Sequence, residues 1–239
     1  MKAMRMASLL FGMLVVFGFL AGQAWAQDPA AAAQGQSWFQ MYIGAGGWIG
    51  YVICFCSFIS VALCIEHVVN IKRDKIVPPQ LIDEIEGMFE NEEYQEALEL
   101  CEAEPNFLTN VLAAGLPKIN AGFDSMKAAM TEASEIEAIK LSQKISLLAL
   151  LANLAPMLGL FGTVSGMIAA FATIAAMGSS VTPADLATGV GQALVTTFLG
   201  LLVAIPTMVA FFLFRNRVVR VTIELTGIAQ DLVERFRGK

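Results

Sequence analysis

The chain has 239 residues, of which 56% are hydrophobic and 15% are charged, and its formal net charge is −6. Soluble globular proteins have about a quarter of their residues charged, so this composition indicates a membrane protein in contact with the lipid bilayer. The negative charge and the absence of a basic stripe argue against nucleic acid as a partner.

The N-terminal segment has the pattern of a secretory signal peptide. Lys2 and Arg5 precede an apolar stretch over residues 7–20, and small residues occupy the positions before a cleavage site after Ala26. This order of basic, apolar and small residues predicts a signal peptide over residues 1–26. An uncleaved anchor helix is the alternative interpretation.

Three apolar segments are long enough to cross a bilayer as helices, because a helical span needs about 20 apolar residues. We expect transmembrane helices over 43–65, 145–177 and 189–214. Lys and Arg follow the first and third spans, whereas the preceding tail, 27–42, and the loop, 178–188, contain neither. Because basic residues accumulate on the cytoplasmic side, this predicts a mature N-terminus outside and a C-terminus inside.

The segments between and after the spans are predicted to be helical and cytoplasmic. Residues 66–144 form a domain in which Pro78 and Pro79 break the chain, and 215–239 form an amphipathic C-terminal helix. From Asp124, a plausible N-cap, the helical pattern continues without a breaker to Met177. One helix of this length would measure about 80 Å.

Ten acidic residues and no basic residue lie between Asp83 and Glu104. They indicate either a docking face or simply the solvated side of short amphipathic helices, and we favour the second interpretation.

The sequence carries no pattern of a metal site, a cofactor site or an enzyme. Its four cysteines and single histidine lack zinc or haem spacing, so we expect no metal and no cofactor. Glu66 and His67 lie at the inner membrane edge, where they form either a proton relay or, as we favour, an interfacial pair. With the one histidine at a membrane border, no nucleophile, base and acid can be combined, so an enzyme is not expected.

The second and third spans carry small and polar residues where lipid would disfavour them. Gly159, Gly162 and Gly166 give the second span a nearly flat side that lets helices approach closely. Pro156 and Pro206 each remove one hydrogen bond and can kink their helices.

The third span places its small and polar residues on one face, namely Gly189, Gln192, Thr196, Gly200 and Thr207, with Thr197 beside them. Packing between helices would explain such a stripe. A lined pore or a buried partner helix explains a stripe on two adjacent spans better, and we favour that interpretation.

Two stretches of this hairpin resemble a known family. Residues 155–167, APMLGLFGTVSGM, and residues 191–206, GQALVTTFLGLLVAIP, are similar to the two signatures of the MotA/TolQ/ExbB proton channel family. The span count and the domain before the hairpin resemble ExbB and TolQ more than the four-span MotA. Gln192 stands where ExbB and TolQ usually have Glu.

This resemblance implies an all-α polytopic protein of the bacterial inner membrane, with two of its three spans extended into the cytoplasm, that assembles as a homo-oligomeric ring, a pentamer. It implies a single-span ExbD/TolR-like partner inside the ring and, indirectly, a TonB/TolA-like protein. The chain would then be a stator subunit that couples the proton-motive force to TonB-dependent outer-membrane transport or a related envelope process. The expected pore-lining residues are Thr163, Gln192, Thr196 and Thr197.

Two other classes stay open, a non-conducting membrane scaffold and a stand-alone ion channel. A stand-alone channel would need its own ionisable residues in the middle of the membrane, and the sequence shows none there.

Overall fold

The computed structural model describes residues 46–91 and 93–234, and all regular structure in this part of the chain is helical. The predicted all-α class is thereby confirmed. Three predicted parts lie outside the described residues: the signal peptide and tail, 1–42, the first three residues of the span predicted for 43–65, and the last five residues of the predicted C-terminal helix. The elements are α3 (Gly47–Asn70), α4 (Arg73–Ile76), α5 (Pro79–Glu90), α6 (Tyr94–Ala103), α7 (Phe107–Gly115), the 3₁₀ helix η2 (Leu116–Ala121), α8 (Phe123–Met177), the 3₁₀ helix η3 (Gly178–Ser180) and α9 (Pro183–Glu234).

Three helices are long and apolar enough to cross a membrane, in agreement with the three predicted spans. They are α3, the α8 segment continued to Ser180, and α9. The chain divides into two compact units. The membrane unit contains α3 up to Glu66, α8 from Leu147 and α9 up to Phe211. The second unit, which we call the head, contains residues 67–146 and the chain from Phe212 onward.

The uninterrupted helix expected from Asp124 to Met177 is confirmed as α8, which begins one residue earlier, at Phe123. The N-cap predicted at Asp124 is wrong, because Asp124 lies inside the first turn. Gly122 precedes the helix with φ +98°, a conformation that glycine adopts without steric cost. In the first turn, the Asp124 carboxylate still carries the charge that a helix N-terminus favours.

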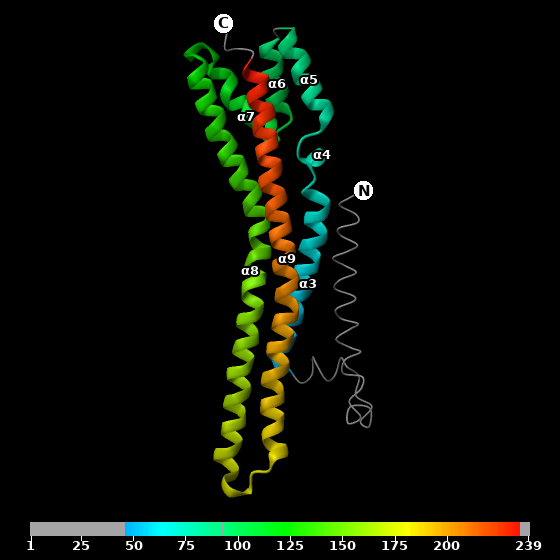
Figure 1. Ribbon diagram of the computed structural model, residues 1–239, viewed down its shortest axis with the longest axis vertical. Helices are drawn as coiled ribbons and strands as arrows, with labels where there is room; N and C mark the ends of the chain where they lie inside the picture. Colours follow the sequence, from blue (N-terminus) through cyan, green and yellow to red (C-terminus); the bar gives the residue numbers. More distant parts are fainter. Residues whose placement is uncertain (1–45, 92, 235–239) are drawn as a thin grey trace. The chain divides into compact units, whose positions relative to one another are not determined.

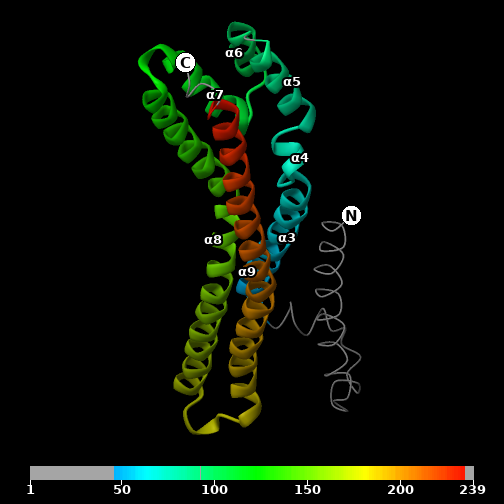
Figure 2. The same ribbon diagram turned by 45° about the horizontal axis from the view of Figure 1, so that its top comes forward.

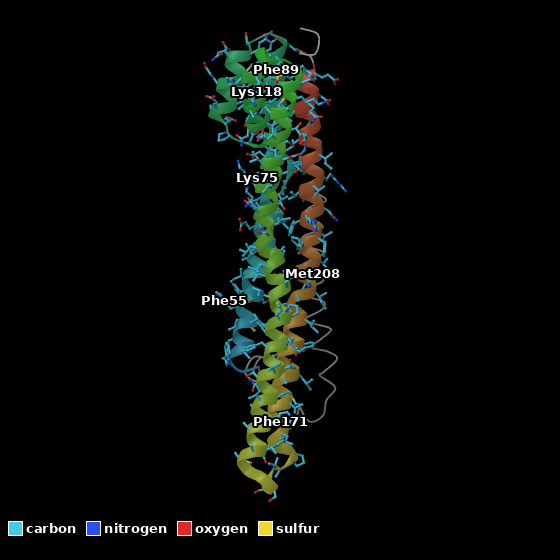
Figure 3. All side chains as sticks on the ribbon, turned by 90° about the vertical axis from the view of Figure 1, so that its left-hand side faces the viewer. Phe55, Lys75, Phe89, Lys118, Phe171 and Met208 are labelled. Carbon is cyan, nitrogen blue, oxygen red and sulfur yellow. The ribbon has the colours of Figure 1, made fainter. Side chains whose placement is uncertain are left out.

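The membrane unit consists of the α8–α9 hairpin with α3 packed against it. Figures 1 and 2 both show α8 and α9 side by side up to the turn at η3. Ile49 and Ile53 of α3 form a buried cluster with Leu199 of α9, and partly buried Leu158, Val195, Leu202 and Val203 surround it. The outer surface stays strongly apolar: Phe55 and Phe171, labelled in Figure 3, are 67% and 62% exposed. Such a surface suits lipid or neighbouring chains.

The head is built from short helices whose ends follow local sequence signals. Pro79 begins α5 at a position where proline's missing N–H costs nothing, as expected from the Pro78–Pro79 break. Leu81, Ile85 and Phe89 are its buried face, at the spacing of one helix side.

The next two helices of the head are bounded in a similar way. Helix α6 ends before Pro105. The Asn106 side chain accepts hydrogen bonds from the backbone of Leu108 and Thr109, while Thr109 accepts one from Asn106, so a reciprocal capping box begins α7.

Candidate functional site in the membrane hairpin

The two arms of the hairpin approach so closely that glycine is required at their contact. A methyl group at Gly200 would come within 2.6 Å of the Ala155 carbonyl oxygen, and one at Gly166 within 2.7 Å of the Gly189 carbonyl oxygen. A methyl group at Gly159 would come within 3.1 Å of the Thr197 Cα. These neighbours are backbone atoms, so only a separation of the helices would relieve the overlap. The flat glycine side predicted for the second span therefore faces the third.

The two prolines predicted to kink the helices lie inside α8 and α9, and both helices continue through them. Pro156 and Pro206 each lack the N–H that would bond to the carbonyl one turn earlier. Pro156 directly follows Ala155, whose carbonyl faces Gly200.

Thr196 packs inside the hairpin of a single chain. Its side chain is fully buried, and a methyl group at Gly162 would overlap both its Oγ1 and its Cβ. Its hydroxyl donates to the carbonyls of Gln192 and Ala193 in its own helix, at 3.0 Å each. Packing between helices thus accounts for Thr196 in one chain. A pore-lining role for it would require the two arms to separate, and that role stays a prediction.

Thr163 of α8 and Thr197 of α9 converge on one carbonyl group. The Thr197 hydroxyl lies 3.3 Å from the Gly159 carbonyl oxygen, across the helix interface, and 3.2 Å from that of Ala193. The Thr163 hydroxyl lies 3.4 Å from the same Gly159 oxygen and 2.7 Å from that of Leu160. Both threonines keep part of their surface exposed. The structure therefore brings these two predicted site residues together and leaves them accessible.

The side chain of Gln192, a residue of α9, lies against the start of α3. A methyl group at Gly47, the first residue of α3, would come within 2.7 Å of the Gln192 Nε2. Gly47 has φ +58°, so the contact combines a left-handed backbone with a close side chain. Nearby, the Trp48 and Phe161 rings meet edge to face with their centroids 6.0 Å apart. Gln192 is partly exposed.

One polar contact between two spans was not predicted from the sequence. The Ser60 hydroxyl of α3 lies 2.6 Å from that of Thr207 in α9, and both side chains are buried. The Thr207 hydroxyl also lies 2.7 Å from the Val203 carbonyl oxygen. Thr207 was part of the polar stripe, but nothing in one sequence pairs it with a serine 147 positions away. A buried polar pair between spans holds the two helices together.

The chemistry available in the hairpin is that of neutral oxygen and amide groups. No Asp, Glu, Lys, Arg or His occurs between Lys144 and Asp185, or between Asp185 and Arg215. Among the described residues no cluster of His, Cys, Asp or Glu is suited to a metal ion. Hydroxyl and carbonyl oxygens can solvate an ion, but they cannot store a proton near neutral pH.

Comparison with known proteins places the hairpin in a family. The model of the MotA/TolQ/ExbB proton channel family matches residues 102–226, more than half of the chain. This matched segment includes both arms of the hairpin and its glycine contact.

Individual relatives agree with this match. A putative ExbB homolog from Methanothermobacter thermautotrophicus is 27% identical over 73% of this chain and 62% of its own length. The biopolymer transport protein ExbB of Xanthomonas campestris is 39% identical over 45% of this chain and 42% of its own. The Tol-Pal system protein TolQ of Pseudomonas aeruginosa is 35% identical over 41% and 42%. The chain thus aligns with less than two thirds of each of these relatives, and it belongs to the MotA/TolQ/ExbB proton channel family.

Proposed function

We propose that this chain is an ExbB/TolQ-like stator subunit of an ion-driven motor in the bacterial inner membrane. In this proposal, several copies form a ring, expected to be a pentamer, around an ExbD/TolR-like single-span partner. Ion flow down the proton-motive force moves the partner and energises a TonB/TolA-like protein. The process served is TonB-dependent outer-membrane transport or a related envelope process. The mature N-terminus is periplasmic and the C-terminus cytoplasmic.

The convergence of Thr163 and Thr197 on the Gly159 carbonyl oxygen is the observation that carries this proposal. Both threonines are partly exposed, and they lie on the two helices that bear the family signatures. Polar groups inside a membrane segment normally face another helix or a wet cavity, because lipid cannot satisfy them. In one chain these two positions are partly exposed, so we assign that cavity or helix to the assembled ring.

Because the hairpin helices have no ionisable residue, this proposal assigns ion solvation to this chain and protonation to its partner. A proton-driven motor needs a group that changes its charge during the cycle, and residues 145–177 and 189–214 contain none. The titratable carboxylate must therefore come from the partner helix. This reasoning separates the proposal from a stand-alone channel, which would carry its own ionisable residue. A non-conducting scaffold predicts no ion flux in any combination of chains.

Substitution of the two threonines tests the ion pathway. Thr163→Ala and Thr197→Ala each remove a hydroxyl without adding volume, so the ring is expected to assemble while energised uptake is lost. Co-purification with the partner, followed by mass measurement of the complex, reports assembly independently of uptake. Full uptake in the double variant would contradict the assignment.

Reconstitution in liposomes tests whether proton flux requires the partner. The chain alone should not dissipate a pH gradient, whereas the complex with its acidic partner should. A physiological proton flux through the chain alone would show that the hairpin supplies the titratable group or a continuous water path by itself.

A further inference from the structure

A groove on the head lies between the segment that begins α5 and the last turns of α9. Its volume is about 340 Å³, within the range of about 300–1,000 Å³ that is usual for ligand sites. The residues that line it all belong to the head: Arg73, Pro79, Ile82, Asp83, Glu86, Ile228, Asp231 and Leu232.

The floor of the groove is apolar. Ile228 and Leu232 are four residues apart on α9, so they lie on the same helix face, and Ile82 of α5 joins them. Leu232 is buried, whereas Ile82 and Ile228 keep part of their surface exposed. A groove that leaves two isoleucines partly uncovered offers apolar area to a side chain from outside.

The walls of the groove are acidic. Asp83, Glu86 and Asp231 contribute carboxylates, and Arg73 is the single basic residue among the described residues that line the groove. The Arg73 Nε donates to the Glu224 Oε1 at 2.8 Å, so a carboxylate already lies against its charge. Among the described residues, the three lining carboxylates and Glu224 sum with the one guanidinium to a formal charge of −3. Asp83 and Asp231 are exposed and therefore able to contact a ligand.

These features select the chemistry of an occupant. Nucleic acids and anionic lipid headgroups would be repelled by the excess of carboxylates. A purely apolar ligand would bury these charges without compensation. A segment that carries apolar side chains and Lys or Arg satisfies both the floor and the walls, as an amphipathic helix does when it binds in a groove.

We propose that this groove binds a basic amphipathic segment that flanks the cytoplasmic end of a partner's membrane helix. The cytoplasmic location of the groove rests on the proposed function. On that side, the flanks of membrane helices are enriched in Lys and Arg, so a single-span partner presents the required charge next to its apolar span. The acidic face of α5 then acts as a docking surface and not only as a solvated side.

Binding of a model peptide to the purified full chain in detergent micelles tests this proposal. The probe is a fluorescein-labelled peptide of fourteen residues, with Leu at helical spacing and Lys or Arg between, and its anisotropy is compared with that in empty micelles. We expect saturable binding that weakens as salt is raised, because screening acts on exposed charges. The double variant Asp83→Asn, Asp231→Asn should bind about 2- to 30-fold more weakly, since each exposed ion pair contributes a factor of about 1.4 to 5.

A matched control separates the groove from general attraction to an acidic surface. The double variant Glu99→Gln, Glu102→Gln removes the same charge from exposed positions on α6, outside the groove, and should leave affinity nearly unchanged. Equal losses in both double variants, or no saturable binding by the unaltered chain, would overturn the proposal.

Two further outcomes would assign the groove to a different occupant and overturn the proposal. Tighter peptide binding by a chain ending at Glu234 would show that the basic residues after it compete for the groove. A change in oligomer mass caused by the Asp83, Asp231 double variant would identify an interface between copies. Because the peptide assay measures neither ion flux nor uptake, its result is independent of the threonine test.

Discussion

The close approach of α8 and α9 at Gly200 makes Gly200→Ala a sharp test of the structure. The added methyl group would lie 2.6 Å from the Ala155 carbonyl oxygen and 3.1 Å from the Gly159 Cα. Both neighbours belong to the backbone of α8, so no side-chain rotation can make room. The two arms of the hairpin must separate locally, and every contact along the glycine side weakens with them.

The expected loss follows from two opposing contributions. Overpacking of a tight contact costs about 1–3 kcal/mol. Replacing a helical glycine by alanine contributes about 0.4–1 kcal/mol in the opposite direction, because the unfolded chain loses conformational freedom. Gly200→Ala should therefore lower the free energy of unfolding by about 0–2.6 kcal/mol.

Gly191→Ala on the same helix supplies the matched control. A methyl group at Gly191 has no neighbour within 4 Å, so this variant keeps the helix-propensity gain and lacks the overlap. The difference between the two variants isolates the steric cost, about 1–3 kcal/mol. Reversible unfolding of the detergent-solubilised protein by added SDS would measure it. Equal unfolding midpoints for the two variants would refute the close α8–α9 contact.

Three other outcomes are expected. Ser60→Ala leaves the buried Thr207 hydroxyl with only its own helix as a partner and should cost about 0.5–1.5 kcal/mol in the same unfolding assay; no change would contradict the α3–α9 contact. Gln192→Glu should still allow assembly, because the side chain lies at Gly47, at the N-terminal end of α3, where negative charge is favoured. Loss of the ring on gel filtration would show that the neutral amide is required for packing. Burial raises the pKa of the Cys101 thiol from 9.0 to about 11, so the free energy of unfolding should fall as pH rises from about 9 towards 11. In a variant without the other cysteines, maleimide should label Cys101 only after unfolding, and rapid labelling of the folded chain would contradict its burial.

The sequence predicted the elements of this protein well, because each depends on local physical chemistry. An apolar run of sufficient length predicts a span, and the unbroken pattern from Asp124 to Met177 predicted the observed α8 to within one residue. The break predicted at Pro78–Pro79 is where α5 begins, and Gly178 with φ +57° lies in the predicted turn. Such signals act over a few residues and can be read without knowledge of the partner elements.

Contacts between distant elements could not be predicted in the same way. Thr196 and Thr197 are adjacent in the sequence and were both expected to line a pore. In the structure Thr196 is fully buried against Gly162, whereas Thr197 is partly exposed. Their difference depends on the rotation of α9 about its axis relative to α8. The Ser60–Thr207 pair likewise depends on how α3 docks, for which helical periodicity alone carries no information.

The geometry around Gly159 also determines which sign of charge the accessible face favours. Thr163 and Thr197 donate their hydroxyl hydrogens to backbone carbonyls. Only the lone pairs of the two hydroxyl oxygens are then available to another group. Lone pairs attract a cation or the acidic hydrogen of a neutral carboxyl, and they cannot donate a hydrogen bond to an anion. In the proposed ion pathway, these two positions would therefore favour a cation over an anion, because backbone carbonyls already engage their hydroxyl hydrogens.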